Sequence, residues 1–265
     1  MIRIGFICPT YQAVALHHYT SRALHSFFET TEGGVALVVD DGTPGWTAEY
    51  EAKLRSIADS YPGSEIITHH FREKGGLTRS WNWGLAEADR LGLDYAIAGN
   101  NDVIFTERWH QGLLHALDSG YTMVGPLSNA PGITAHGKQE IGKYFEGYKV
   151  TDDPTYLDSV AESLHANHLG KVIESEVNGF FQMCSMDGWR SNKYSQKEFY
   201  RAVNKLTSKG HRNLTPLMTL NEDEWQGRAR AKKKKSAIVL SSFIFHYRAV
   251  TRGDRYKRGQ WYRQK

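Results

Sequence analysis

The sequence predicts an α/β fold with a mostly parallel central sheet. Short apolar runs alternate with longer segments of helical spacing through the first 125 residues. A crossover helix between two strands places them in parallel, so this order predicts a sheet that helices cover on both faces. Polar and acidic residues directly follow three of the apolar runs. Ligands bind at the carboxyl ends of the strands in such sheets, which makes the first half a candidate Rossmann-like nucleotide-binding unit.

Five short apolar runs are predicted to be strands because turn-forming residues bound most of them. They cover residues 2–8, 35–39, 66–70, 94–98 and 123–125. Four segments with apolar residues at helical spacing are predicted to be helices. They cover residues 15–28, 48–61, 78–91 and 106–119. Residues 126–176 are richer in loops and polar residues, and we interpret them as an insertion over the site.

The composition is that of an ordinary soluble globular protein. The chain has 265 residues, of which 40% are hydrophobic and 23% charged. No apolar stretch approaches the roughly 18 residues of a membrane span, and Pro9 interrupts the first apolar run too early for a signal peptide. Cys8 and Cys184 form no disulfide framework. We therefore expect a cytoplasmic protein with a single domain.

The C-terminal segment is strongly basic. Residues 226–265 hold 13 of the 33 Lys and Arg residues but only one acid, Asp254. The rest of the chain has 20 basic and 28 acidic residues. Tyr and Trp residues lie between the arginines after His246, a pattern that fits a polyanion such as a nucleotide diphosphate or a nucleic acid. For the lysines at 232–235, a solvated helix end is an equally good interpretation.

Three predicted strand ends carry the residues that suggest chemistry. They are Pro9-Thr10-Tyr11, Asp40-Asp41 and Asn100-Asn101-Asp102. These ends converge on one edge of a parallel sheet. A carboxylate there can hold a divalent cation, and the cation can hold a diphosphate, although an Asn-Asp sequence after a strand is also ordinary turn chemistry. The sequence has no Gly-x-Gly-x-x-Gly after the first strand and no P-loop lysine motif, which disfavours dinucleotide-binding and P-loop folds.

The same segments, in order along the chain, resemble family 2 glycosyltransferases with the GT-A fold. Ile7-Cys-Pro-Thr-Tyr-Gln resembles the first strand and turn of that family, and Val38-Val-Asp-Asp-Gly-Thr resembles its second-strand signature. Asn100-Asn-Asp-Val resembles a variant of its Asp-x-Asp metal motif. The remaining resemblances are Gly75-Gly-Leu-Thr-Arg-Ser-Trp-Asn-Trp-Gly-Leu-Ala, Asn178-Gly-Phe-Phe-Gln-Met, Asn221-Glu-Asp-Glu-Trp and Phe245-His-Tyr-Arg.

The resemblance implies transfer of a sugar from a nucleotide-diphosphate donor, UDP-sugar being favoured, to an acceptor hydroxyl. Mn²⁺ or Mg²⁺ is the implied cofactor, with Asp102 and His246 as its ligands. Asp223 is the implied catalytic base, and Glu222 is the second choice. One base and one metal imply direct displacement with inversion at the anomeric carbon, because the sequence offers no candidate for a covalent intermediate.

The resemblance also implies that the one domain is made of a nucleotide-sugar-binding half (1–125) and an acceptor-binding and catalytic half (126–265). It further implies two groups of binding residues. The donor group comprises Pro9, Thr10, Tyr11, Asp41, Arg79, Asn82, Asn100, Asn101, Arg248 and Arg252. Within it, the three arginines are expected to support the phosphates through charge-assisted hydrogen bonds. The acceptor group comprises Phe180 and Trp225, of which Trp225 is expected to stack on the acceptor.

One departure from the family pattern concerns the metal. Asn100 stands where the motif has its first Asp, so one carboxylate is missing. An Asn carbonyl can still coordinate a cation, and substrate phosphates add ligands.

Four functions remain open on the sequence. The first is transfer to a saccharide, which we favour, and the second is transfer to a hydroxymethylated pyrimidine in phage-type DNA. The third is a nucleotidyltransferase, which the missing Gly-rich basic loop after the first strand disfavours. The fourth is an inactive nucleotide-sugar-binding module, which the presence of Asp102, Asp223 and His246 disfavours.

Overall fold

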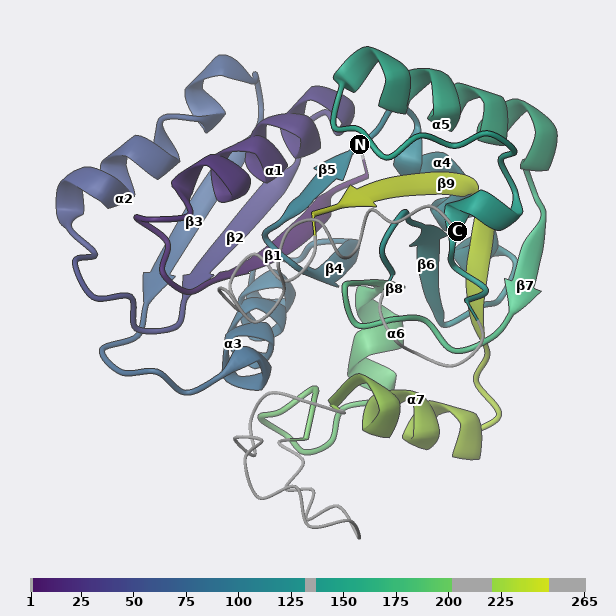
Figure 1. The fold of residues 1–265 in the computed structure, drawn as a ribbon. Helices are drawn as coiled ribbons and strands as arrows, with labels where there is room; N and C mark the ends of the chain where they lie inside the picture. Colours follow the sequence, from purple (N-terminus) through teal and green to yellow (C-terminus); the bar gives the residue numbers. More distant parts are fainter. Residues whose placement is uncertain (1, 132–136, 202–220, 248–265) are drawn as a thin grey trace, which may run out of the picture.

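The computed structural model describes residues 2–131, 137–201 and 221–247 (Figure 1). Nine strands in these residues form one sheet, in the order β3-β2-β1-β4-β8-β6-β9-β5, and β7 pairs with β9. The strands are β1 (Ile4–Thr10), β2 (Val35–Asp40), β3 (Glu65–His70), β4 (Tyr95–Gly99), β5 (Val103–Phe105), β6 (Met123–Leu127), β7 (Val172–Glu174), β8 (Phe181–Ser185) and β9 (Ser236–His246). Arg248 and Arg252 lie outside the described residues.

Seven α-helices accompany the sheet in the described part of the chain. They are α1 (His17–Thr30), α2 (Ala48–Arg55), α3 (Leu77–Arg90), α4 (Trp109–Asp118), α5 (Pro154–His168), α6 (Met186–Ser191) and α7 (Asn221–Ala231). Two 3₁₀ turns lie at Ala58–Ser60 and Ile141–Lys143. Among the residues described, none of the helices combines the length and the apolar composition that a membrane crossing needs.

The predicted parallel half is confirmed. Strands β3, β2, β1 and β4 are all parallel, and the helices α1 to α3 connect them. The second half of the sheet is mixed, because β8 runs antiparallel to both β4 and β6 while β9 runs parallel to β6. The structure differs from the predicted elements in three places. The helix predicted at 48–61 ends at Arg55 and continues only as a 3₁₀ turn, β5 precedes α4, and 126–176 contains both α5 and β7.

Successive residues of the central strands face opposite sides of the sheet and fill two separate cores. Phe6 and Val38 belong to one apolar cluster, together with residues of α1, α2 and α4. Ile7 and Leu37 belong to the other, together with residues of α3, α6 and α7. Because both faces are covered, the strands read as continuous apolar runs in the sequence.

Helix α3 packs closely against β1. Gly84 lies in the middle of α3, and a methyl group added there would collide with the Ile7 side chain. Gly227 lies in the middle of α7, and an added methyl group there would meet no atom within 4 Å.

These two glycines give a matched test of the packing. We expect Gly84→Ala to lower the free energy of unfolding by about 1–3 kcal/mol, because the core at Ile7 must shift. Gly227→Ala should raise it by roughly 0.5–1 kcal/mol, because alanine favours the helix and fits the space. Urea unfolding followed by circular dichroism measures both. Equal effects of the two substitutions would contradict the close packing of α3 on β1.

Candidate donor and metal site

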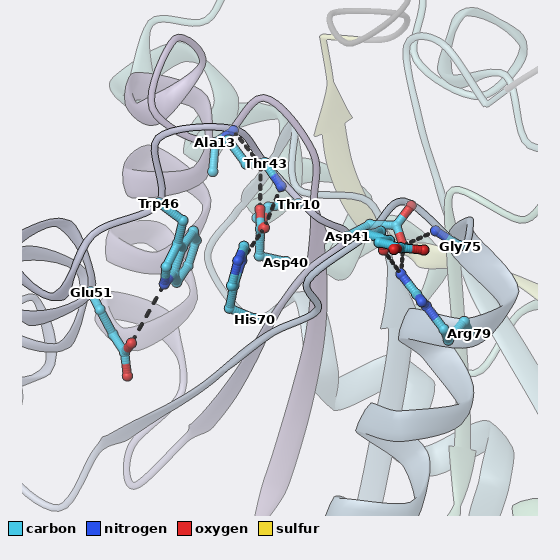
Figure 2. Close-up of polar contacts among 11 residues, drawn as sticks. Thr10, Ala13, Asp40, Asp41, Thr43, Trp46, Glu51, His70, Gly75 and Arg79 are labelled. Carbon is cyan, nitrogen blue, oxygen red and sulfur yellow. Dashed lines mark hydrogen bonds and ion pairs between the residues drawn. The ribbon is translucent and has the colours of Figure 1, made fainter.

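Asp40 ties together the ends of three parallel strands (Figure 2). Its carboxylate is fully buried. It accepts hydrogen bonds from the Thr10 hydroxyl at 3.0 Å, from the Thr43 backbone N–H at 2.7 Å, and from the Thr43 hydroxyl. His70 Nδ1 at the end of β3 lies 2.8 Å from Asp40 Oδ2. Both oxygens of the Asp40 carboxylate are hydrogen-bonded within the protein. Asp40 therefore holds the strand ends together, and Thr10 is one of its hydrogen-bond donors.

Asp41, the next residue, points to the loop that precedes α3 (Figure 2). Its Oδ1 accepts from Gly75 N at 2.9 Å and from Arg79 Nη2 at 2.7 Å, and its Oδ2 accepts from Gly76 N at 2.8 Å. A carboxylate offers about four acceptor positions, and the residues that the structure describes fill three of them. No described residue fills the remaining acceptor position on Oδ2.

Two cations lie over aromatic rings beside Asp41. The guanidinium of Arg79 lies 3.8 Å from the centre of the Phe71 ring, and the ammonium of Lys74 lies 3.8 Å from the centre of the Tyr11 ring. The Nε atom of Arg79 is buried and has no hydrogen-bond partner. Arg79 is therefore held by Asp41 and Phe71 and keeps one donor unused, whereas Lys74, which the sequence interpretation missed, covers the Tyr11 ring.

Three predicted donor-site residues are engaged within the protein or lie inside a strand. The Asn82 amide binds backbone groups of Phe199 and Tyr200 at distances of 2.8–3.0 Å. Asn101 is buried and donates to the Thr20 hydroxyl at 3.0 Å. Pro9 lies in β1 opposite Val39. Asn82 and Asn101 therefore hold neighbouring chain segments in place.

The end of β4 and the end of β9 bring the predicted metal ligands together. Asp102 Oδ1 lies 3.2 Å from His246 Nε2, and both side chains are almost fully buried. The Asn100 amide Nδ2 also lies 3.2 Å from His246 Nε2. No group of three or more His, Cys, Asp or Glu side chains that could hold a metal occurs in the described residues. Asp102, His246 and the Asn100 amide are thus the candidate ligand set.

The tautomer of His246 fits a metal ligand. Its Nδ1 lies 2.8 Å from the Ala130 carbonyl oxygen, which can only accept, so Nδ1 carries the proton. In the neutral imidazole, Nε2 then presents a lone pair toward the carboxylate of Asp102. Two acceptors facing each other at 3.2 Å need a proton or a cation between them. A lone pair, a carboxylate and an amide oxygen form a suitable donor set for a divalent cation, once the Asn100 amide is turned to present its oxygen.

The first turn of helix α7 lies against Gly179, the residue before Phe180. A methyl group added at Gly179 would lie 2.7 Å from Glu222 Oε1, so the Glu222 carboxylate rests on the backbone of residue 179. Burial raises the pKa of Glu222, and the neighbouring Asp223 carboxylate raises it further. Asp223 is exposed in the first turn of α7.

The two predicted acceptor-side aromatic residues are both buried. Phe180 stacks on His246, with ring centres 5.1 Å apart and planes inclined by 16°. Trp225 is 0% exposed and packs edge-on against Trp189. The burial of Trp225 contradicts its predicted stacking on the acceptor, because no face of the indole is open. It lies one turn after Asn221 on the buried side of α7, and adjacency to the acidic residues was a misleading signal.

Comparison with known proteins supports the fold. No family model and no curated protein sequence matches the chain. Among solved structures, S. aureus TarS (residues 1–349) is similar with a TM-score of 0.51 and 12% identity, over 93% of this chain and 60% of that one. GalNAc-T7 with UDP, GalNAc and Mn²⁺ is similar with a TM-score of 0.58 and 13% identity, over 92% of this chain and 43% of that one. The predicted resemblance to the GT-A glycosyltransferase fold is confirmed, and the chain spans about half the length of these neighbours.

The raised pKa of Glu222 predicts a pH-dependent stability difference. Between its ordinary pKa and its raised pKa in the folded protein, the unfolded chain binds fewer protons, so stability falls as pH rises. We expect Glu222→Gln to match the wild type near pH 4 and to exceed it in melting temperature at higher pH, with the gain levelling off above the raised pKa. Thermal unfolding from pH 4 to 8 measures this. Exposed Asp59→Asn is the control, and a constant difference for Glu222→Gln across the pH range would contradict it.

Proposed function

We propose that this protein transfers a sugar from a nucleoside diphosphate to an acceptor hydroxyl, with a divalent cation and with inversion. The observation that carries the proposal is the pairing of Asp102 and His246 at the carboxyl ends of β4 and β9, on the same fold as glycosyltransferases. Mn²⁺ is present in one of the similar structures, which also contains UDP.

Asp102, His246 and the Asn100 amide oxygen would hold the cation. A bound cation acts as a Lewis acid that stabilises the negative charge of a leaving diphosphate. The surrounding residues contribute by excluding water, because Asp102 and His246 are at least nine-tenths buried. Phe180 covers one face of the imidazole and restricts its orientation.

We place the nucleoside at Tyr11, Asp41 and Arg79. The remaining acceptor position on Asp41 Oδ2 suits a base with an imide N–H, such as uracil, which supports a UDP-sugar donor. Arg79 retains an unpartnered Nε donor. We keep Thr10, Asn82 and Asn101 as residues that support the site, and the assignment of Arg248 and Arg252 to the phosphates stays a prediction.

We place the general base at the start of α7. The resemblance favours Asp223, whereas the position of Glu222 against residue 179 and its raised pKa favour Glu222 as the proton acceptor. A base works best when its pKa is near the working pH, and the pKa of Glu222 is shifted in that direction by burial. A saccharide is the favoured acceptor, and DNA stays an alternative that depends on residues 248–265.

A binding experiment with the metal tests the proposal. We expect calorimetry to show that the protein binds UDP and that Mn²⁺ raises the affinity for UDP. ADP and CDP should bind more weakly than UDP. Asp102→Asn should remove at least about 10²-fold of the Mn²⁺ affinity, because an amide replaces the only carboxylate of the ligand set. Asp59→Asn, at an exposed turn, is the matched control. UDP binding and sugar-nucleotide hydrolysis that are indifferent to Mn²⁺, EDTA and Asp102→Asn would refute the metal-dependent reaction.

Two conservative substitutions distinguish the candidate bases. Removal of the true base should reduce turnover by roughly 10²–10⁴ while UDP affinity is kept. Steady-state kinetics of Asp223→Asn and Glu222→Gln, with UDP titration on each variant, identifies which one it is. If neither substitution affects turnover, the base lies elsewhere and the displacement mechanism at α7 is wrong. Binding of UDP-sugar without turnover by the wild type would instead support the inactive-module alternative.

A further inference from the structure

The side chain of Asn129 binds both backbone polar groups of His246. Asn129 Oδ1 accepts from His246 N at 2.8 Å, and Asn129 Nδ2 donates to His246 O at 3.1 Å. An amide side chain therefore makes the two hydrogen bonds that a neighbouring strand would otherwise make. No sequence motif pointed to Asn129, which lies just after β6.

The register of β9 explains why His246 needs this partner. Val103 of β5 lies opposite His246 as a non-hydrogen-bonded pair, because the hydrogen bond between the strands here joins the flanking residues, from Tyr247 N to Asp102 O at 2.9 Å. Residues alternate in the direction of their backbone groups along a strand, so the N–H and C=O of His246 point away from β5. His246 is nearly buried, and buried backbone groups without partners are costly. Asn129 satisfies both of them.

The next residue fixes the ring. The Ala130 carbonyl oxygen lies 2.8 Å from His246 Nδ1 and thereby leaves Nε2 as the nitrogen that faces Asp102 and Asn100. The preceding residue, Ser128, fixes the position of Asn129 and Ala130. Its backbone N–H donates to Gln139 O and its C=O accepts from Ile141 N, and its hydroxyl accepts from Ala130 N. Two consecutive residues thus set the backbone and the tautomer of one imidazole.

We infer that Asn129 is a positioning residue for the metal centre. It touches neither donor nor cation, yet it holds His246 so that the Nε2 lone pair meets the Asp102 carboxylate. This inference rests on the proposed function for the identity of the ligand, while the orientation of His246 is independent of it. Outer partners of metal ligands commonly determine ligand orientation and affinity.

Aspartate is the sharpest replacement. Asn129→Asp keeps the shape of the side chain and the acceptor toward His246 N. It replaces the Nδ2 donor with a carboxylate oxygen, which then faces the His246 carbonyl oxygen, so that two acceptors repel each other. Asn129→Ala removes both bonds. Asn167→Asp, on the exposed face of α5, is the matched control, because its exposed amide bonds to Ser163 within its own helix.

The test has a metal-binding part and a metal-free part. Mn²⁺ alone is titrated into each full-length variant by calorimetry, and its affinity should fall about 10–100-fold for Asn129→Asp and Asn129→Ala. Asn167→Asp should bind Mn²⁺ like the wild type, and UDP affinity without metal should not change in any variant. In the His246→Ala background, Asn129→Asp should cause no further loss, since its effect passes through His246.

The metal-free part measures which nitrogen of the His246 imidazole carries the proton. The ¹⁵N spectrum of His246, assigned by its loss in His246→Ala, should show a proton on Nδ1 in the wild type and a mixture of tautomers in Asn129→Asp. Unchanged Mn²⁺ affinity and an unchanged tautomer in folded Asn129 variants would overturn the inference. If the wild type binds no Mn²⁺ while the tautomer still shifts, the proposed function fails and the positioning role stands. Should both Asn129 variants fail to fold, the spectrum of the wild type alone decides, because a proton on Nε2 would refute the arrangement.

Discussion

The buried carboxylate of Asp40 is the interaction on which the candidate donor site depends. The carboxyl ends of parallel strands lie at one edge of the sheet, but the loops that follow β1, β2 and β3 run in different directions. Asp40 holds three of these ends together by accepting from Thr10, from Thr43 and from His70. A charge buried without partners would be strongly unfavourable, so the loops after β1, β2 and β3 have to keep the geometry that supplies those donors.

Adjacent carboxylates take separate tasks because successive side chains of a strand point to opposite sides. Asp40 points to the side of His70 and Trp46, where the imidazole and the indole stack with ring centres 5.4 Å apart. Asp41 points to Gly75 and Arg79 instead. The loop before α3 approaches Asp41 closely because Gly42, with φ of 81°, leaves no side chain in the way of the Glu73 backbone. One short segment thereby supplies both the support of the site and its candidate recognition group.

Pattern alone predicted β1 to β4, β6 and α1 to α4, because apolar runs and segments of helical spacing alternate in the first 125 residues. It did not predict the other strands of the second half of the sheet, where β5 has three residues and β8 and β9 pair with strands distant in sequence. The pairing of Asp102 with His246 followed from the order of motifs, whereas Asn129 and Lys74 carry no local signal and acquire their roles from tertiary contacts. Trp225 was misassigned because the exposed or buried side of α7 depends on packing against Trp189.

Residues 126–176, interpreted as an insertion over the site, contact the end of β9 at several points. Asn129 and Ala130 bind His246, and Asp152 accepts from the Tyr247 hydroxyl at 2.7 Å while pairing with Arg22 of α1.

Under the proposed function, the candidate ligand set has a consequence for charge. Asp102 is the only carboxylate in the candidate ligand set, so a divalent cation there keeps an excess positive charge in a buried place. A diphosphate removes that excess, and binding energies are reciprocal. Each therefore strengthens the binding of the other, and the substitution of an amide for a carboxylate at Asn100 makes the cation centre depend on the donor.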